Sequence, residues 1–200
     1  MTINSKDLIK AIRTSDESIF NRLTDKTASI SGAGFKGDHI AAIRIHGIAC
    51  PDTTWENCIF NDVEFDAIDF QNAKFTSCSF HQCRFNQPIL AETVFEGCVF
   101  NHTAFIDTED AEALVINNCQ FQESIIKNIH FIDTNITSST YTQGELTDID
   151  GEGTLKSFVL RDVAISHFDT SDMTVLACTA SSCKTLPSGF KSVEGRRRRV

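Results

Sequence analysis

Residues 55–105 read WENCIFNDVEFDAIDFQNAKFTSCSFHQCRFNQPILAETVFEGCVFNHTAF. A large apolar residue, nearly always Phe, occurs at every fifth position of this stretch, from Trp55 to Phe105. A smaller residue, such as Cys58 or Ala73, precedes most of them by two positions, and the other positions are mostly polar. A period of five matches neither an α-helix, with about 3.6 residues per turn, nor a long strand with alternating side chains. It suits a chain that turns a corner every five residues.

This pattern of a small residue, any residue, a Phe or Leu and two further residues resembles that of the pentapeptide-repeat proteins. Proteins of that family form right-handed quadrilateral β-helices, in which four sides of five residues make one coil. The resemblance covers residues 28–183 and implies an all-β fold of this kind, with about seven coils and a length of ~35 Å. One large and one small residue per side fill the interior. Any ligand or partner is therefore expected to bind the outer surface.

The coil length predicts which side chains stack. Residues twenty apart lie on adjacent rungs about 4.8 Å apart, so Phe60, Phe80 and Phe100 are expected to form a ladder of rings. The same count stacks cysteines in a column of small inward residues, formed by Cys58, Cys78, Cys98 and Cys119. Metal ligands converge on one point, whereas these thiols follow a line. We therefore expect reduced, buried core cysteines and no metal site.

The period breaks at two places. Asp110 stands where a large residue is due, and the frame resumes one residue later at Ile116, which predicts an outward loop near residues 106–113. A second shift falls at residues 150–153, and two registers fit the sequence beyond it. In one of them, Cys178 returns to the cysteine column.

The two ends of a solenoid expose strand edges and core, and they require caps. Residues 1–27 are predicted to form a short N-terminal α-helical cap, because apolar residues follow at helical spacing from Ser5, a candidate N-cap. Residues 184–200 are predicted to form a disordered C-terminal tail that ends in Arg196–Arg199 and Val200. No closing helix is visible there, so two copies could pair as a homodimer through the open coil end.

The formal net charge of −9 is distributed unevenly. Residues 51–155 contain 18 acidic and 3 basic residues, whereas the flanking segments carry net charges of +2 and +4. Such a rod attracts basic surfaces and repels nucleic acid. The alternative interpretation is a solvated surface that keeps a Phe-rich rod soluble. The candidate contact residues for a basic protein partner are Asp62, Glu64, Asp66, Asp69, Glu92, Glu96, Asp107, Glu109, Asp110 and Glu112.

No phosphate-binding loop, nucleophile elbow, metalloprotease motif or acid–base pair is present in the sequence, and neither a signal peptide nor a membrane span. We expect a bacterial, cytoplasmic, non-enzymatic protein without cofactor or metal, which binds neither nucleic acid nor membranes directly. The leading hypothesis is a scaffold that presents acidic β-helix faces to a protein partner with a basic surface.

The resemblance to the Qnr and MfpA type of family member implies an alternative. These proteins act as mimics of duplex DNA, so this chain could regulate a DNA-binding enzyme such as DNA gyrase. They dimerise through a C-terminal segment, which has no visible counterpart here. A third hypothesis is a secreted bacterial effector or a toxin-immunity protein, because repeats of this kind occur in such systems.

Overall fold

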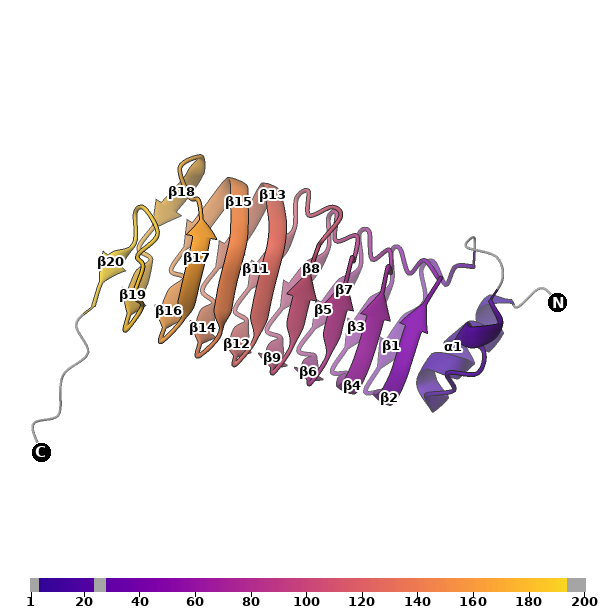
Figure 1. Cartoon of the computed structure of the whole chain (residues 1–200). Helices are drawn as coiled ribbons and strands as arrows, with labels where there is room; N and C mark the ends of the chain where they lie inside the picture. The colour runs from indigo at the N-terminus through magenta and orange to yellow at the C-terminus, as the bar shows by residue number, and fades with distance from the viewer. Residues whose placement is uncertain (1–3, 24–27, 194–200) are drawn as a thin grey trace, which may run out of the picture.

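The computed structural model describes residues 4–23 and 28–193 of the chain. Its strands form one continuous sheet that winds around a single axis, and all pairing between rungs is parallel. The result is a right-handed, four-sided β-helix of about seven turns, with a short helix at its N-terminal end (Figure 1). The predicted fold class is confirmed.

Each side of the rod is named after a large residue that points inward from it: the Trp55, Phe60, Phe65 and Phe70 sides. The Trp55 side contains β1 (Gly34–Lys36), β3 (Thr54–Glu56), β5 (Lys74–Thr76), β8 (Val94–Glu96), β11 (Val115–Asn117) and β18 (Met173–Leu176). The Phe60 side contains β6 (Ser79–His81), β9 (Val99–Asn101), β12 (Gln120–Gln122), β14 (Thr140–Thr142), β16 (Val159–Arg161), β19 (Thr179–Ser181) and β20 (Lys191–Ser192).

The remaining strands lie on or pass through the Phe65 side. It contains β7 (Arg84–Asn86), β10 (Ala104–Ile106) and β17 (Ala164–Phe168). Two strands, β2 (His39–His46) and β4 (Ile59–Asp66), reach it from the Phe60 side. Two longer strands, β13 (Ile125–Thr137) and β15 (Glu145–Lys156), start on it and continue across the Phe70 side. N-terminal to β13, successive rungs of the Phe70 side are joined by isolated β-bridges.

Stacked aromatic rings fill the N-terminal half of the rod. Phe60, Phe80 and Phe100 are at most 1% exposed and pair in register across β4, β6 and β9. Their ring centroids lie 4.7 and 4.8 Å apart, with interplanar angles of 2° and 7°. The spacing matches the distance between strands, so every ring contacts the one above and the one below it. The predicted ladder is confirmed.

The chain turns most corners through a single residue with positive φ. In one coil these residues are Asn57, Asp62, Ala67 and Asn72, with φ between 50° and 56°. Asn and Asp tolerate this left-handed conformation better than most residues because their short polar side chains can bond locally. This requirement, together with exposure, explains why polar residues follow the large residue of each repeat.

The small inward residues also satisfy backbone groups. Cys78 donates its thiol to the carbonyl oxygen of Trp55 at 3.3 Å, and Thr93 donates its hydroxyl to that of Phe70 at 2.8 Å. In both cases the acceptor lies 23 residues earlier, on the preceding rung. Burial raises the pKa of the Cys83 thiol to about 11, which makes it unreactive at neutral pH. The cysteines are free, and all except Cys183 are buried.

Two one-residue changes interrupt the register. Ile89 pairs with Asp110 and Phe105 with Ile126, so one residue has been added between these rungs. Ala111 then takes the inward position. The second change lies between β13 and β15, where Phe131 pairs with Gly151 but Thr134 pairs with Gly153. Here one residue has been lost, so pairs that span this point are nineteen residues apart, and the spacing then returns to twenty.

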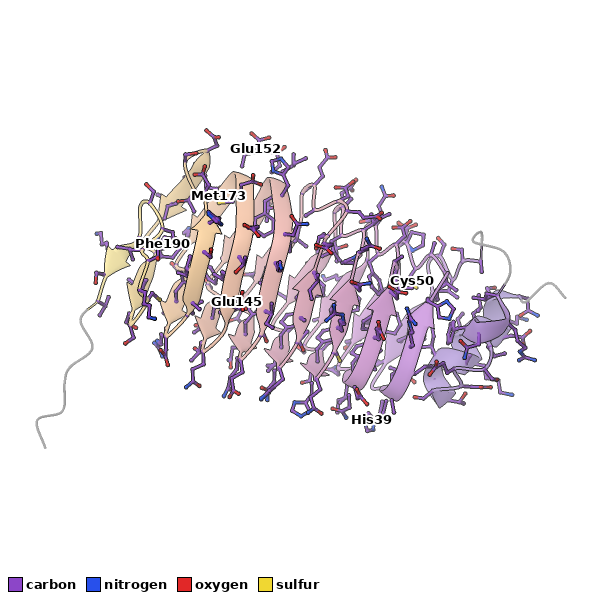
Figure 2. All side chains as sticks on the ribbon, in the orientation of Figure 1. His39, Cys50, Glu145, Glu152, Met173 and Phe190 are labelled. Carbon is purple, nitrogen blue, oxygen red and sulfur yellow. The ribbon has the colours of Figure 1, made fainter. Side chains whose placement is uncertain are left out.

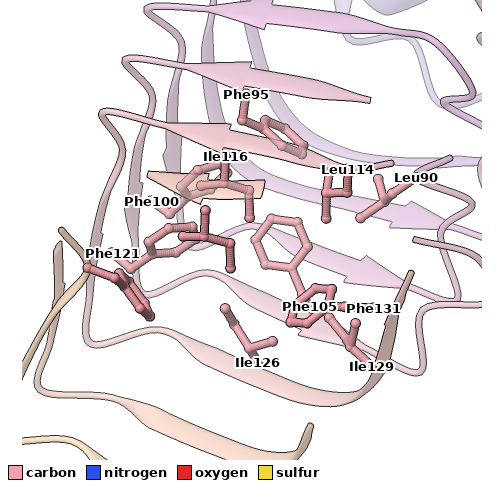
Figure 3. A pocket seen from close by; sticks show the side chains of 12 residues that line it. Leu90, Phe95, Phe100, Phe105, Leu114, Ile116, Phe121, Ile126, Ile129 and Phe131 are labelled. Carbon is pink, nitrogen blue, oxygen red and sulfur yellow. The ribbon is translucent and has the colours of Figure 1, made fainter. Parts of the chain in front are cut away.

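A small cavity lies where the aromatic core gives way to an aliphatic one. It has a volume of about 30 Å³ and is enclosed by apolar side chains, among them Phe105, Leu114, Ile126 and Phe131 (Figure 3). A single water needs roughly 10–15 Å³ on this measure and also needs polar partners. This cavity is therefore too small for a substrate or cofactor of ordinary size.

The N-terminal cap covers the first rung. Helix α1 (Ser5–Thr14) buries Leu8, Ala11 and Ile12, and a 3₁₀ turn, η1 (Phe20–Arg22), buries Phe20. The N-cap of α1 is Asn4, whose side chain accepts a hydrogen bond from the Asp7 N–H, so the assignment of this role to Ser5 is wrong.

Hydrogen bonds also protect the exposed edge of β2. The Ser15 hydroxyl oxygen accepts from the Ala41 N–H at 2.9 Å, and the Glu17 carboxylate accepts from the Arg44 N–H at 3.4 Å. Such bonds satisfy backbone groups that an open strand edge would leave free.

The C-terminal end differs from the sequence-based expectation. Residues 184–193 are not a disordered tail, because β20 pairs with β19 and Phe190 is only 6% exposed. The Phe190 ring packs near those of Phe158 and Phe168, at 6.3 and 6.5 Å. This short segment partly closes the last coil. Residues 194–200, with the four arginines, lie outside the described residues.

Candidate protein-binding surface

The four sides of the rod differ sharply in charge. Within the described residues, the outward positions of the Phe60 side carry no carboxylate, from His39 on β2 to Ser181 on β19. Ile59 and Val99 are exposed there, at 45% and 39%. The carboxylates of the central coils must therefore lie on other sides.

Most of them lie on the Phe70 side. We define the acidic face as this side with its two bordering corners, residues 47–53, 67–73, 87–93, 107–114, 128–134, 148–153 and 167–173. These segments contain no Lys or Arg. Their thirteen carboxylates belong to Asp52, Asp69, Glu92, Asp107, Glu109, Asp110, Glu112, Asp133, Asp148, Asp150, Glu152, Asp169 and Asp172. In Figure 2, Glu152 marks this face, while His39 lies at the opposite edge of the rod.

Several of these aspartates also stabilise the backbone. Asp69, Asp110 and Asp169 each accept a hydrogen bond, of 2.8–2.9 Å, from the backbone N–H two residues later. Hydrogen bonds from Ser171, first from its backbone N–H, lower the pKa of Asp169 below its ordinary value. These residues hold the turns of a side that has few regular strands. A structural role thus accounts for part of the acidity, and it leaves the charge facing solvent.

Six of the ten predicted contact residues lie on the acidic face: Asp69, Glu92, Asp107, Glu109, Asp110 and Glu112. Four of these come from the segment with the added residue. There, Asp107 accepts a hydrogen bond from the Asn128 side chain at 2.9 Å, while Glu109 and Glu112 are exposed. The hydroxyl oxygen of the neighbouring Thr108 is buried and has no hydrogen-bond partner within the described part of the chain.

The other four predicted contact residues are elsewhere. Glu64 and Asp66 lie on the Phe65 side, where Arg44 pairs with both carboxylates. Hydrogen bonds from Asn86 and from Arg44 lower the pKa of Asp66. Asp62 occupies the corner between the Phe60 and Phe65 sides. Glu96 lies on the Trp55 side and accepts two hydrogen bonds from the side chain of Asn117, at 2.9 and 3.0 Å.

Sequence reasoning missed seven carboxylates of this face: Asp52, Asp133, Asp148, Asp150, Glu152, Asp169 and Asp172. A signal was available for Asp52, since counting by twenty puts it in one column with Asn72 and Glu92. Beyond residue 150 the register was open, so the columns could not be extended.

A groove crosses the C-terminal end of the acidic face. It has a volume of about 840 Å³ and lies where β13, β15 and β17 bend from the Phe65 side onto the Phe70 side. Two imidazoles contact carboxylates on the neighbouring rung: His130 Nδ1 lies 2.6 Å from Asp150, and His167 Nδ1 lies 3.1 Å from Asp148. Phe168 also borders the groove, but it pairs with the inward Ile149 and its ring packs near that of Phe190.

The described residues hold no group of three His, Cys, Asp or Glu side chains that could bind a metal ion. None of the helices in the described ranges is long and apolar enough to cross a membrane. At the C-terminal end of the rod, β17 and β18 pair only with the preceding rung in the described part of the chain. Leu176, the last residue of β18, is 48% exposed. A homodimer through this end stays a prediction.

Comparison with solved structures finds matches at low sequence identity and low TM-score. A trypsin-treated QnrB1 variant, described as a plasmid-mediated fluoroquinolone resistance protein, is 13% identical, with 84% of this chain and 92% of that chain covered and a TM-score of 0.37. HetL, a pentapeptide repeat protein involved in heterocyst differentiation regulation from the cyanobacterium Nostoc sp. strain PCC 7120, is 6% identical, with 96% and 94% covered and a TM-score of 0.30. Rfr23, from the cyanobacterium Cyanothece 51142, is 8% identical, with 85% and 97% covered and a TM-score of 0.25.

Among curated proteins, none matches the sequence. Residues 56–87 match the family model for pentapeptide repeats, with eight copies. The same inward ladders continue on both sides of that segment, from Ile30 to Cys178. The repeat that this family model describes therefore continues, in the structure, well beyond the matched residues.

Proposed function

We propose that this protein is a non-enzymatic scaffold whose acidic face binds a protein partner with a basic surface. One observation carries the proposal: thirteen carboxylates and no Lys or Arg share one side of the rod. Like charges repel, so gathering them on one side costs stability, and a partner that binds the resulting field would account for that cost. The solid interior, with a cavity of only about 30 Å³, supports a role for the outer surface.

We propose as contact residues the six predicted carboxylates on this face, together with the seven further carboxylates that share the face. Glu64 and Asp66 are left out because Arg44 already pairs with both. Ten of the thirteen carboxylates belong to exposed residues, and none of the thirteen is buried. A partner can therefore reach them without any change in the fold.

A DNA-mimic regulator is the second candidate, and the spacing of charge favours it. From Asp52 to Asp172 the face covers seven rungs, and the six intervals between them measure about 29 Å at about 4.8 Å each. Thirteen carboxylates over this length give roughly one negative charge per 2.2 Å, against about 1.7 Å in duplex DNA. A DNA-binding enzyme such as DNA gyrase would meet a similar charge density on both.

Neutralising part of the acidic face should weaken partner binding without weakening the fold. The test variant carries Asp69→Asn, Glu92→Gln, Asp110→Asn and Glu112→Gln; Asn can still accept the turn hydrogen bonds of Asp69 and Asp110. We expect the affinity for a partner captured from a bacterial lysate to fall about tenfold or more, mainly through a slower on-rate, and to lose much of its salt dependence. The melting temperature should stay the same or rise slightly, because like charges are removed.

The control variant removes four charges from outside the acidic face: Asp62→Asn, Glu123→Gln, Glu145→Gln and Asp162→Asn. It should bind nearly as the wild type does. Equal losses in both variants would mean that only net charge matters, and binding that survives in the test variant would refute the proposal. In a gyrase supercoiling assay with the same proteins, no effect at micromolar concentration would eliminate the DNA-mimic version alone.

A further inference from the structure

We propose that residues 184–190 form a strap that keeps the C-terminal end of the rod from pairing with the same end of a second copy of this chain. Lys191 on β20 pairs with Thr179 on β19, only twelve residues earlier, whereas Thr179 pairs with Val159, twenty residues earlier. The chain between β19 and β20 is therefore too short to follow the other three sides of the rod. It crosses the end of the rod instead.

The strap covers apolar side chains of the last coil. The Phe190 ring lies 6.3 Å from that of Phe158 and 6.5 Å from that of Phe168. Figure 2 places Phe190 at the C-terminal end of the rod. Gly189 lies against Val175 on the Trp55 side, where a Cβ atom on the glycine would come 2.9 Å from the Val175 Cβ. A larger residue at this point would therefore push the strap away from the coil.

Hydrogen bonds attach the strap to two sides of the rod. The Thr170 hydroxyl, on the Phe70 side, donates to the carbonyl oxygen of Ser188 at 3.0 Å. The Lys191 N–H, where the strap enters β20, donates to the carbonyl oxygen of Cys178 at 3.0 Å. Together with the contact at Val175, these bonds hold the strap across the middle of the end.

The strap leaves strand edges open beside it. In the described part of the chain, β17 and β18 pair only with the preceding rung. Their inward residues Ile165 and Val175 are half-buried, whereas their partners on the preceding rung, Leu146 and Leu155, are at most 2% exposed. An open strand edge next to apolar side chains is a template for pairing with another chain.

The same end of a second copy is the partner that fits these edges. It offers the same open strands and the same apolar side chains, as a twofold contact requires. The N-terminal end does not offer them, because α1 and η1 cover its first rung. The strap lies between two C-terminal ends and keeps them further apart than the about 4.8 Å at which strands pair.

The homodimer predicted from the sequence uses this end, so we expect it only when the strap is displaced. The inference does not rest on the proposed function, because it concerns the end of the rod and not the acidic face.

Sedimentation velocity of the full chain over a range of concentrations tests the proposal. The wild type should sediment as a monomer throughout. Gly189→Val forces a branched side chain against Val175, and Phe190→Ser removes the apolar contact of the strap. We expect the sedimenting mass of both variants to about double at high concentration, as for a twofold dimer. Leu186→Ala is the matched control in the same strap, and it should stay monomeric because Leu186 is 44% exposed.

Two further measurements locate the contact. Circular dichroism should show the wild-type β-sheet signal in both strap variants, because the strands from β1 to β19 keep their sequence. Hydrogen exchange in the Gly189→Val variant should slow at β17 and β18 as the concentration rises. Adding Leu176→Lys to that variant places a charge beside the edge of β18 and should restore the monomer.

The proposal would be overturned by a wild type that already dimerises through β17 and β18. Strap variants that stay monomeric with their β-sheet signal intact, or exchange that slows elsewhere in the rod, would also overturn it. Loss of the β-sheet signal in both strap variants would do the same, because the strap would then support the fold as a whole and not merely cover its end.

Discussion

Replacing Phe80 by alanine should lower the free energy of unfolding by about 3–5 kcal/mol. Phe80 is 1% exposed, and its ring stacks between those of Phe60 and Phe100 at 4.7 and 4.8 Å. It also contacts Phe75 and Phe85 edge-on, at 5.7 and 5.5 Å. Truncation removes these contacts and leaves a cavity that a β-helix closed by hydrogen bonds cannot collapse to fill. Denaturant unfolding followed by circular dichroism measures the loss.

The control for this prediction is Lys74→Ala, at an exposed outward position on β5. It should change the free energy of unfolding by less than about 0.5 kcal/mol. The assignment of inward and outward positions would be wrong if the two variants unfolded at the same denaturant concentration.

Gly151→Ala should cost about 3 kcal/mol or more, although it adds a single methyl group. Gly151 has φ of 125°, and a Cβ atom there would lie 2.0 Å from the carbonyl oxygen of Phe131 and 2.6 Å from its backbone nitrogen. The close approach arises because β15 has one residue fewer than β13 at this point. Neither strand can move away without breaking the parallel pairing on both sides. The same denaturant unfolding experiment measures the cost.

Gly37→Ala is the matched control, because Gly37 also has positive φ, 67°, but a Cβ atom at this position would have no described atom within 4 Å. Alanine already occupies the same type of corner at Ala42 and Ala67. The cost there should stay near about 1 kcal/mol. A loss at Gly151 no larger than that at Gly37 would show that the deletion site is not under steric constraint.

The sequence specified the interior of this protein much better than its surface. Inward positions recur because packing demands a large residue every fifth place, and the ladder of Phe60, Phe80 and Phe100 followed directly from that count. Outward residues meet no such demand, so their type alone does not reveal their side. Asp66 and Asp69 are three residues apart in sequence, yet they lie on different sides of the rod.

The two register changes account for most of what was missed. His130 lies twenty residues before Asp150, which is the ordinary coil length, whereas His167 lies nineteen after Asp148, so only the second pairing depends on placing the lost residue. The prediction of a disordered C-terminal tail failed for a different reason. The large buried residue of this segment is Phe190, and a single apolar residue shows no periodicity from which a strand could be predicted.

Carboxyl footprinting on the bound partner complex tests the central claim most directly. Exposed carboxylates are coupled to glycine ethyl ester with a carbodiimide, and mass spectrometry compares labelling with and without the captured partner. We predict that labelling falls at Glu92, Glu112 and Asp150 and stays unchanged at Asp62 and Glu145, because only the first three lie on the acidic face. Protection at Glu145 or Asp62, or no protection anywhere while the partner stays bound, would contradict the account.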